Sequence, residues 1–70
     1  MKEICRLIHA DGSVEHIRMS AWSGCVYSDR HKGPLFDGFR FSCKADALTE
    51  IGTMYRNRFK IEFEHEHQSD

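Results

Sequence analysis

Two histidines near the end of the chain, His65 and His67, are the closest pair among the sequence's histidines and cysteines, the side chains that most often bind zinc. Residues two apart on a β-strand lie on the same face, so both imidazoles could reach one ion. Further ligands would have to come from His9, His16 or a cysteine. The alternation of residues 59–67 explains both histidines as strand residues. We therefore predict no metal and no other cofactor, and keep a small zinc-binding domain as an alternative.

The three cysteines, Cys5, Cys25 and Cys43, are too widely spaced to form the close ligand pairs of a zinc site. Their odd number also argues against a secreted disulfide framework. Cys43 precedes a predicted helix, where a thiol can become a reactive thiolate. A 70-residue chain with one predicted helix leaves little room for a substrate pocket. We predict that the protein is not an enzyme and has no catalytic residue. If it were an enzyme, Cys43 would be the first candidate for its nucleophile.

Aromatic and basic side chains gather in residues 22–36. Aromatic and arginine residues carry much of the binding energy at protein–protein interfaces. The alternative is that the aromatic residues cover the core and the basic residues are simply solvated. The predicted partner-binding residues are Trp22, Tyr27, Arg30, His31, Lys32 and Phe36.

The charge balance disfavours a nucleic-acid partner. Ten Lys and Arg against eleven Asp and Glu give a formal net charge of −1, whereas such binding depends on neutralising many phosphates. Four of the acids lie in residues 61–70, which contain no Lys or Arg. A nucleic-acid-binding accessory protein with a basic patch remains an alternative, and its residues would be Arg30, Lys32, Arg40, Arg56 and Arg58.

The first element that must position these residues is a β-hairpin around Asp11-Gly12, since Asp-Gly between two β-rich runs is a strong hairpin signal. The sequence allows two registers of the hairpin. A shift of one residue between them exchanges the side chains that face the core with those that face solvent. A two-residue turn groups Ile4, Ile8, Ile17 and Met19, whereas a three-residue loop with a bulge groups Cys5, Leu7 and Ile17. We favour the two-residue turn.

The rest of the chain predicts two further strands, one helix and a last strand. Residues 25–27 read as a short strand, 28–34 as a loop, and 35–43 as a strand with Phe39 and Phe41 on one side. Residues 44–56 show a helical apolar stripe with Ser42 as its N-cap, and 59–67 alternate as a strand. The stripe consists of Ala45, Leu48, Ile51, Gly52 and Tyr55.

These elements predict a single α+β domain spanning residues 1–70. A small, mainly antiparallel sheet of four to five strands, in the order β-β-(β)-β-α-β, has one helix packed on one face. No stretch reads as a signal peptide or a membrane span, so we expect a cytoplasmic protein with no membrane partner.

A small, near-neutral chain without catalytic groups is typical of accessory proteins of phages and mobile elements. We therefore predict a small non-enzymatic protein-binding module, an inhibitor of the anti-CRISPR kind. Its partner would be a larger host protein or protein complex, blocked by occlusion through the partner-binding residues named above or through an open sheet edge that accepts another strand. The small core also predicts a homodimer that pairs sheet edges about a two-fold axis.

Overall fold

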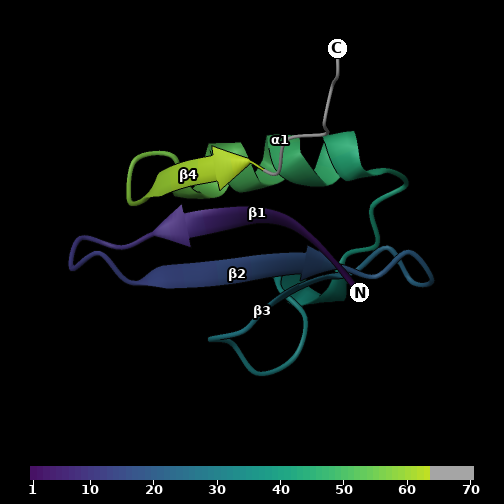
Figure 1. Cartoon of the computed structure of the whole chain (residues 1–70). Coiled ribbons are helices and arrows are strands. Elements are labelled where there is room, and N and C mark those ends of the chain that lie inside the picture. Colours follow the sequence, from purple (N-terminus) through teal and green to yellow (C-terminus); the bar gives the residue numbers. More distant parts are fainter. Residues whose placement is uncertain (64–70) are drawn as a thin grey trace, which may run out of the picture.

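The structure is a computed structural model, and it describes residues 1–63 of the chain. These residues form four antiparallel strands and one helix. The strands are β1 (Lys2–Ile8), β2 (Val14–Met19), β3 (Val26–Ser28) and β4 (Lys60–Phe63). They lie in the order β3-β2-β1-β4, and the helix α1 (Lys44–Tyr55) packs on one face (Figure 1). The predicted α+β fold with one helix is confirmed.

The hairpin of β1 and β2 shows that the favoured register is wrong by one residue. Cys5 lies opposite Ile17, and Leu7 lies opposite Glu15. This pairing buries Cys5, Leu7 and Ile17 together, as the three-residue loop requires. Ile8, which the favoured register placed in the core, is half-buried on the other face of the sheet.

The hydrogen bonds of the loop explain the slip. Gly12 N–H donates to His9 O at 2.9 Å, and His9 N–H donates to Ser13 O at 2.9 Å. Gly12 has a φ of +89°, so the loop is a turn followed by a glycine bulge. Ser13 donates two hydrogen bonds to Asp11 Oδ1, and these bonds hold the pKa of the Asp11 carboxyl below its usual range. Asp-Gly therefore fits either loop, because both need glycine at positive φ.

A second bulge, between Glu3 and Cys5, buries two neighbouring residues of β1. Glu3 pairs with Arg18 and Cys5 with Ile17, so Ile4 has no partner of its own. Neighbouring side chains of a regular strand point to opposite faces. Here Ile4 and Cys5 are both buried in the core, so the bulge adds a core side chain that a regular strand would expose.

The predicted strand at residues 35–43 is wrong. Pro34 makes an isolated bridge to Tyr27, and Leu35 N–H donates to Val26 O at 2.7 Å. The chain then leaves the sheet through the short 3-10 turn η1 (Phe36–Gly38), in which all three residues have positive φ. Proline has no N–H with which to extend a strand ladder, and Asp-Gly tolerates the left-handed turn.

The predicted helix is confirmed, with two corrections. Cys43 rather than Ser42 is the N-cap residue, and its side chain makes no capping hydrogen bond. Ser42 Oγ–H instead donates to Asp46 Oδ2 at 3.1 Å. On the apolar stripe Ala45 is exposed, and Ala47 takes its place against the sheet.

The buried core lies on the α1 side of the sheet. The other face carries charged and polar pairs instead, because Glu3 accepts a hydrogen bond from Arg6 at 2.7 Å and Glu3 Oε1 lies 2.8 Å from His16 Nδ1. Such surface pairs contribute at most about 1 kcal/mol each, so the apolar face holds the sheet in place. The core residues are Ile4, Cys5, Leu7, Ile17, Val26, Leu35, Ala47 and Ile51.

The last strand follows the predicted alternation only in part, because it begins at Lys60 rather than at residue 59, and Phe63, predicted for the core face, is 42% exposed. Ile61 is half-buried and lies opposite Leu7, while Lys60 and Glu62 are exposed. The part of the predicted strand from residue 64 to 67, with His65 and His67, lies outside the described residues.

The backbone of Gly24, in the turn between β2 and β3, lies close to the backbone of Phe41, and this contact can be tested by substitution. Gly24 has a φ of +79°, and a Cβ there would lie 2.5 Å from the backbone oxygen of Phe41. We expect Gly24→Ala to lower the free energy of unfolding by about 2–4 kcal/mol, from backbone strain and overpacking together. Urea denaturation followed by circular dichroism measures this loss.

The matched control is Gly12→Ala, because Gly12 also has positive φ and its added Cβ would meet nothing within 4 Å. This variant carries the backbone strain alone and should lose about 1 kcal/mol. Equal losses in the two variants would contradict the close contact between Gly24 and Phe41.

Candidate functional site

Trp22 is the most exposed large apolar side chain among the described residues, at 95%. It lies in the turn between β2 and β3, and hydrogen bonds on both sides fix that turn. Gly24 N–H donates to Ser20 O at 2.8 Å, and Ser23 N–H donates to Ser20 Oγ at 3.1 Å. The indole is therefore held out in solvent by a bonded turn.

A groove of about 370 Å³ lies beside this indole. We call it the Trp22 groove, and three segments that are distant in sequence form it. They are the start of β1, the β2–β3 turn, and the stretch that leads into α1; the hydrogen bond from Phe41 N–H to Gly24 O, at 2.8 Å, joins the last two. Its lining residues are 2, 4, 19–24 and 41–44.

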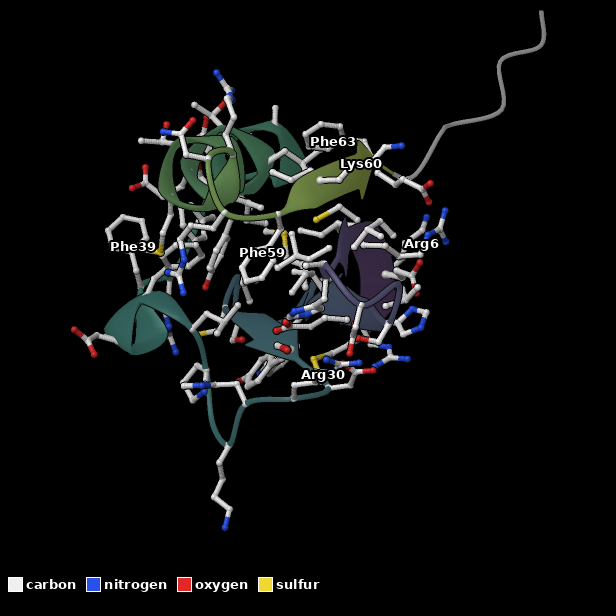
Figure 2. All side chains as sticks on the ribbon, turned by 90° about the vertical axis from the view of Figure 1, so that its left-hand side faces the viewer. Arg6, Arg30, Phe39, Phe59, Lys60 and Phe63 are labelled. Atoms are coloured by element: carbon white, nitrogen blue, oxygen red, sulfur yellow. The ribbon has the colours of Figure 1, made fainter. Side chains whose placement is uncertain are left out.

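An aromatic cluster continues the groove toward η1. The ring of Phe41 meets those of Phe39 and Phe36 edge to face, with centroids 4.8 and 5.5 Å apart. Phe39 is 59% exposed, whereas Phe36 and Phe41 are half-buried against the core. Figure 2 shows Phe39 beside the 3-10 turn, at the periphery of the molecule. We call Trp22, Phe36, Phe39 and Phe41 the aromatic surface.

Basic side chains border this surface. Lys2 and Lys44 line the Trp22 groove, and Arg40 lines a hollow beside Phe39 and Phe41. Asp46 and Glu50 line the same hollow as Arg40, so charges of both signs lie there. The groove thus combines an exposed indole with two lysines, a set suited to an apolar partner segment that carries acidic groups.

The structure brings only two of the six predicted partner-binding residues to this surface, Trp22 and Phe36. Tyr27 lies in β3 opposite Arg18, on the face of the sheet away from α1. The other three, Arg30, His31 and Lys32, lie in the exposed loop after β3, at the opposite end of that strand from the turn that carries Trp22 (Figure 1).

The loop that carries Arg30 is held by its neighbours. Arg30 N–H donates to Ser28 Oγ at 3.0 Å, and the Arg30 guanidinium lies 3.4 Å from Val14 O. The backbone of His16 also exchanges hydrogen bonds with Asp29. This loop forms a second exposed basic region, separate from the Trp22 groove.

Sequence reasoning missed Phe39, Phe41, Lys2 and Lys44 as surface residues. Phe39 and Phe41 alternate with polar neighbours, which is also the pattern of a strand with one buried side. The signal that could have separated them is Asp37-Gly38, which favours a tight turn rather than a continuing strand. Lys2 and Lys44 meet in the groove only through the tertiary fold.

A polar network lies on the inner face of the sheet, at the end away from Trp22. His9 Nε2 lies 2.9 Å from Glu15 Oε1, and Ser28 Oγ–H donates to Glu15 Oε2. Nearby, burial and the negative charge of Glu15 raise the pKa of the Tyr55 phenol, and the charge of Arg58 partly offsets this effect.

The Ser28 hydroxyl is buried, so it offers a substrate little access, although the carboxylate beside it could act as a base. Ser28 and His9 bond to the two oxygens of the same Glu15 carboxylate, so the carboxylate lies between them. The arrangement satisfies a buried hydroxyl and ties β3 to β2.

The three thiols differ in exposure. Cys5 and Cys25 are buried, while Cys43 is exposed in the Trp22 groove. Burial, with a smaller contribution from Glu3, raises the pKa of Cys5 to about 12, although Arg6 acts in the other direction. Cys25 Sγ–H donates to Gly38 O at 3.4 Å. Two of the thiols are therefore core groups.

Among residues 1–63, no group of three or more His, Cys, Asp or Glu side chains is placed to hold a metal ion. The pair His65 and His67 lies outside those residues, so the zinc alternative stays a prediction. Over the same range, no helix is both long and apolar enough to cross a membrane.

No protein-family model, curated protein or solved structure matches the sequence. The interpretation of the site therefore depends on its geometry and chemistry alone.

The difference in thiol exposure gives a prediction. Under native conditions at pH 8, we expect a thiol reagent such as DTNB to modify Cys43 at least about tenfold faster than Cys5 or Cys25, because only exposed thiolates react. Mass spectrometry of the labelled peptides identifies the sites. In urea all three should react at similar rates, and fast native labelling of Cys5 would contradict its place in the core.

Proposed function

We propose that this protein is a small non-enzymatic protein-binding module, which acts by covering part of a larger protein or complex. The observation that carries the proposal is Trp22, 95% exposed on a hydrogen-bonded turn beside a groove. Tryptophan is enriched among the residues that dominate binding energy at protein interfaces.

The exposed indole is hard to explain through the stability of the fold. An aromatic side chain buries about 150–250 Å² on full burial, at about 25 cal/mol per Å², so about 4–6 kcal/mol is gained before association costs. At its present exposure Trp22 gains almost none of this in the isolated chain. A partner that covers the indole would realise that gain.

The aromatic surface gives the partner more than one contact. Phe39 is exposed next to Phe41, and Phe41 lines the Trp22 groove as well as the hollow beside Phe39. An apolar segment lying along this surface would cover both exposed rings, while Lys2 and Lys44 would favour acidic groups at its margin.

The basic residues do not favour the nucleic-acid alternative. Arg30 lies after β3, whereas Arg40 lies beside the aromatic surface. Arg58 stacks over the ring of Phe59, with the guanidinium carbon 5.4 Å from the ring centroid. The positive charges are thus divided among several regions rather than gathered into one phosphate-binding track.

The narrower proposal is an inhibitor of the anti-CRISPR kind from a phage or mobile element, which blocks a host protein or complex. Its support is the near-neutral charge and the exposed aromatic surface. Affinity purification with the full chain from its native host, followed by mass spectrometry, identifies the partner.

With that partner in hand, we expect Trp22→Ala to weaken binding by about thirtyfold, the loss that corresponds to a residue contributing about 2 kcal/mol. The melting temperature should stay within about 2 °C, because the side chain is exposed. Isothermal titration calorimetry measures the affinity and circular dichroism the melting.

Arg30→Glu is the matched control, since Arg30 is exposed in a different region of the molecule. It should change the affinity by less than about threefold. Loss of binding in Arg30→Glu with Trp22→Ala unaffected would move the site to the loop after β3. A salt-sensitive shift of labelled DNA or RNA, without any captured protein, would support the nucleic-acid alternative.

A further inference from the structure

The two edges of the sheet differ. At the β3 edge the chain covers itself, because Pro34 bridges Tyr27 and Leu35 donates to Val26 O. At the other edge, β4 pairs with β1 on one side, and no segment of residues 1–63 pairs with its other side. An edge strand with open N–H and C=O groups is a template for another strand.

The sequence of this edge, FKIEF at residues 59–63, is complementary to itself when read in the opposite direction. In an antiparallel pair centred on Ile61, Ile61 meets its own copy and Phe59 meets Phe63. Lys60 meets Glu62 on both sides of the centre. Opposite charges and aromatic pairs directly across an antiparallel ladder both stabilise it.

We propose that two copies of this chain associate through β4, antiparallel and about a two-fold axis at Ile61, to form one continuous sheet. The helices of both copies then lie on the same face, because opposed residues in an antiparallel pair share a face. A closed two-fold contact of this kind is the commonest form of homodimer.

The charges select this centre from its neighbours. A centre at Lys60 would place two lysines opposite each other, and a centre at Glu62 would oppose two glutamates; like charges directly opposite are destabilising. A centre between two residues would set Ile61, which faces α1, against Glu62, which faces away from it. Only the centre at Ile61 matches both the charges and the faces.

The side chains around β4 are arranged for this contact. Figure 2 shows Lys60 and Phe63 on β4, with Phe59 just before it and Arg6 on the neighbouring strand. Glu62 Oε1 lies 3.4 Å from Arg6 Nε, and the side chain of Glu62 is half-exposed. Among residues 1–63 no carboxylate pairs with Lys60. In the dimer, Lys60 of the second copy would contact Glu62, which would still be paired with Arg6 of its own chain.

The apolar face fits as well. Phe63 is 42% exposed, although it lies on the side of the sheet that faces α1. A groove of about 280 Å³ between β4 and α1 is lined by Phe59, Gly52 and Arg56, among others. In the proposed register, Phe63 of the second copy lies opposite Phe59 and enters this groove.

The test is a pair of charge reversals in the full chain, measured by sedimentation equilibrium from about 5 µM to 500 µM. We expect the wild type to dimerise with rising concentration. In Lys60→Glu, glutamates oppose glutamates, and in Glu62→Lys, lysines oppose lysines. Each variant alone should dimerise at least about tenfold more weakly.

An equimolar mixture of the two variants should recover association, because every opposed pair across the mixed dimer is then Glu with Lys. Lys32→Glu, the same charge change in the loop after β3, and Trp22→Ala should both dimerise like the wild type. Circular dichroism checks that each variant is folded.

A wild type that stays monomeric to 500 µM would overturn the proposal, as would Lys60→Glu dimerising like the wild type. A mixture that gains nothing over its folded components would do the same. If Glu62→Lys fails to fold, because the introduced lysine would face Arg6, the wild type, Lys60→Glu and Lys32→Glu still decide the question.

Discussion

The register of β1 against β2 is the constraint on which the rest of the structure depends. The glycine bulge at Gly12 and the bulge between Glu3 and Cys5 together turn Ile4, Cys5, Leu7 and Ile17 toward α1. A slip of one residue would send the charged side chain of Arg6 into the core and Leu7 into solvent. The helix could then no longer pack on the sheet, because Ala47 and Ile51 would lose the apolar face that they contact.

A core on one side of a thin sheet leaves the functional possibilities to the surface. A chain of this size buries only about 60% of the surface that it exposes when unfolded, and no buried side-chain N or O among the described residues lacks a hydrogen-bond partner. The surface regions of residues 1–63 include the Trp22 groove with its aromatic surface, and the outer edge of β4, with which no described segment pairs. They lie on different parts of the fold, so the chain can present both at once, and occupation of one does not require the other.

The sequence predicted the elements better than it predicted how they meet. The helix follows from its apolar stripe and the fold class from the order of elements. Asp11-Gly12 indicated the hairpin but not its register, because glycine at positive φ serves both loops. Phe39 and Phe41 alternate with polar residues as in a strand, but the left-handed turn at Phe36–Gly38 directs the chain away from the sheet before them. Of the candidate site, Trp22 and Phe36 were predicted from residue type. Lys2 and Lys44 were not, since they are brought to one groove by contacts between segments distant in sequence.

Nuclear Overhauser effects across the first hairpin, in the uniformly labelled full chain, test the central claim most directly. The register described here predicts backbone contacts between Cys5 and Ile17 and between Leu7 and Glu15, with an interruption at Ile4. Contacts between Arg6 and Ile17 and between Ile8 and Glu15 would show the two-residue turn instead. The core, the charged outer face and the outward position of the β4 charges would then all have to be reassigned.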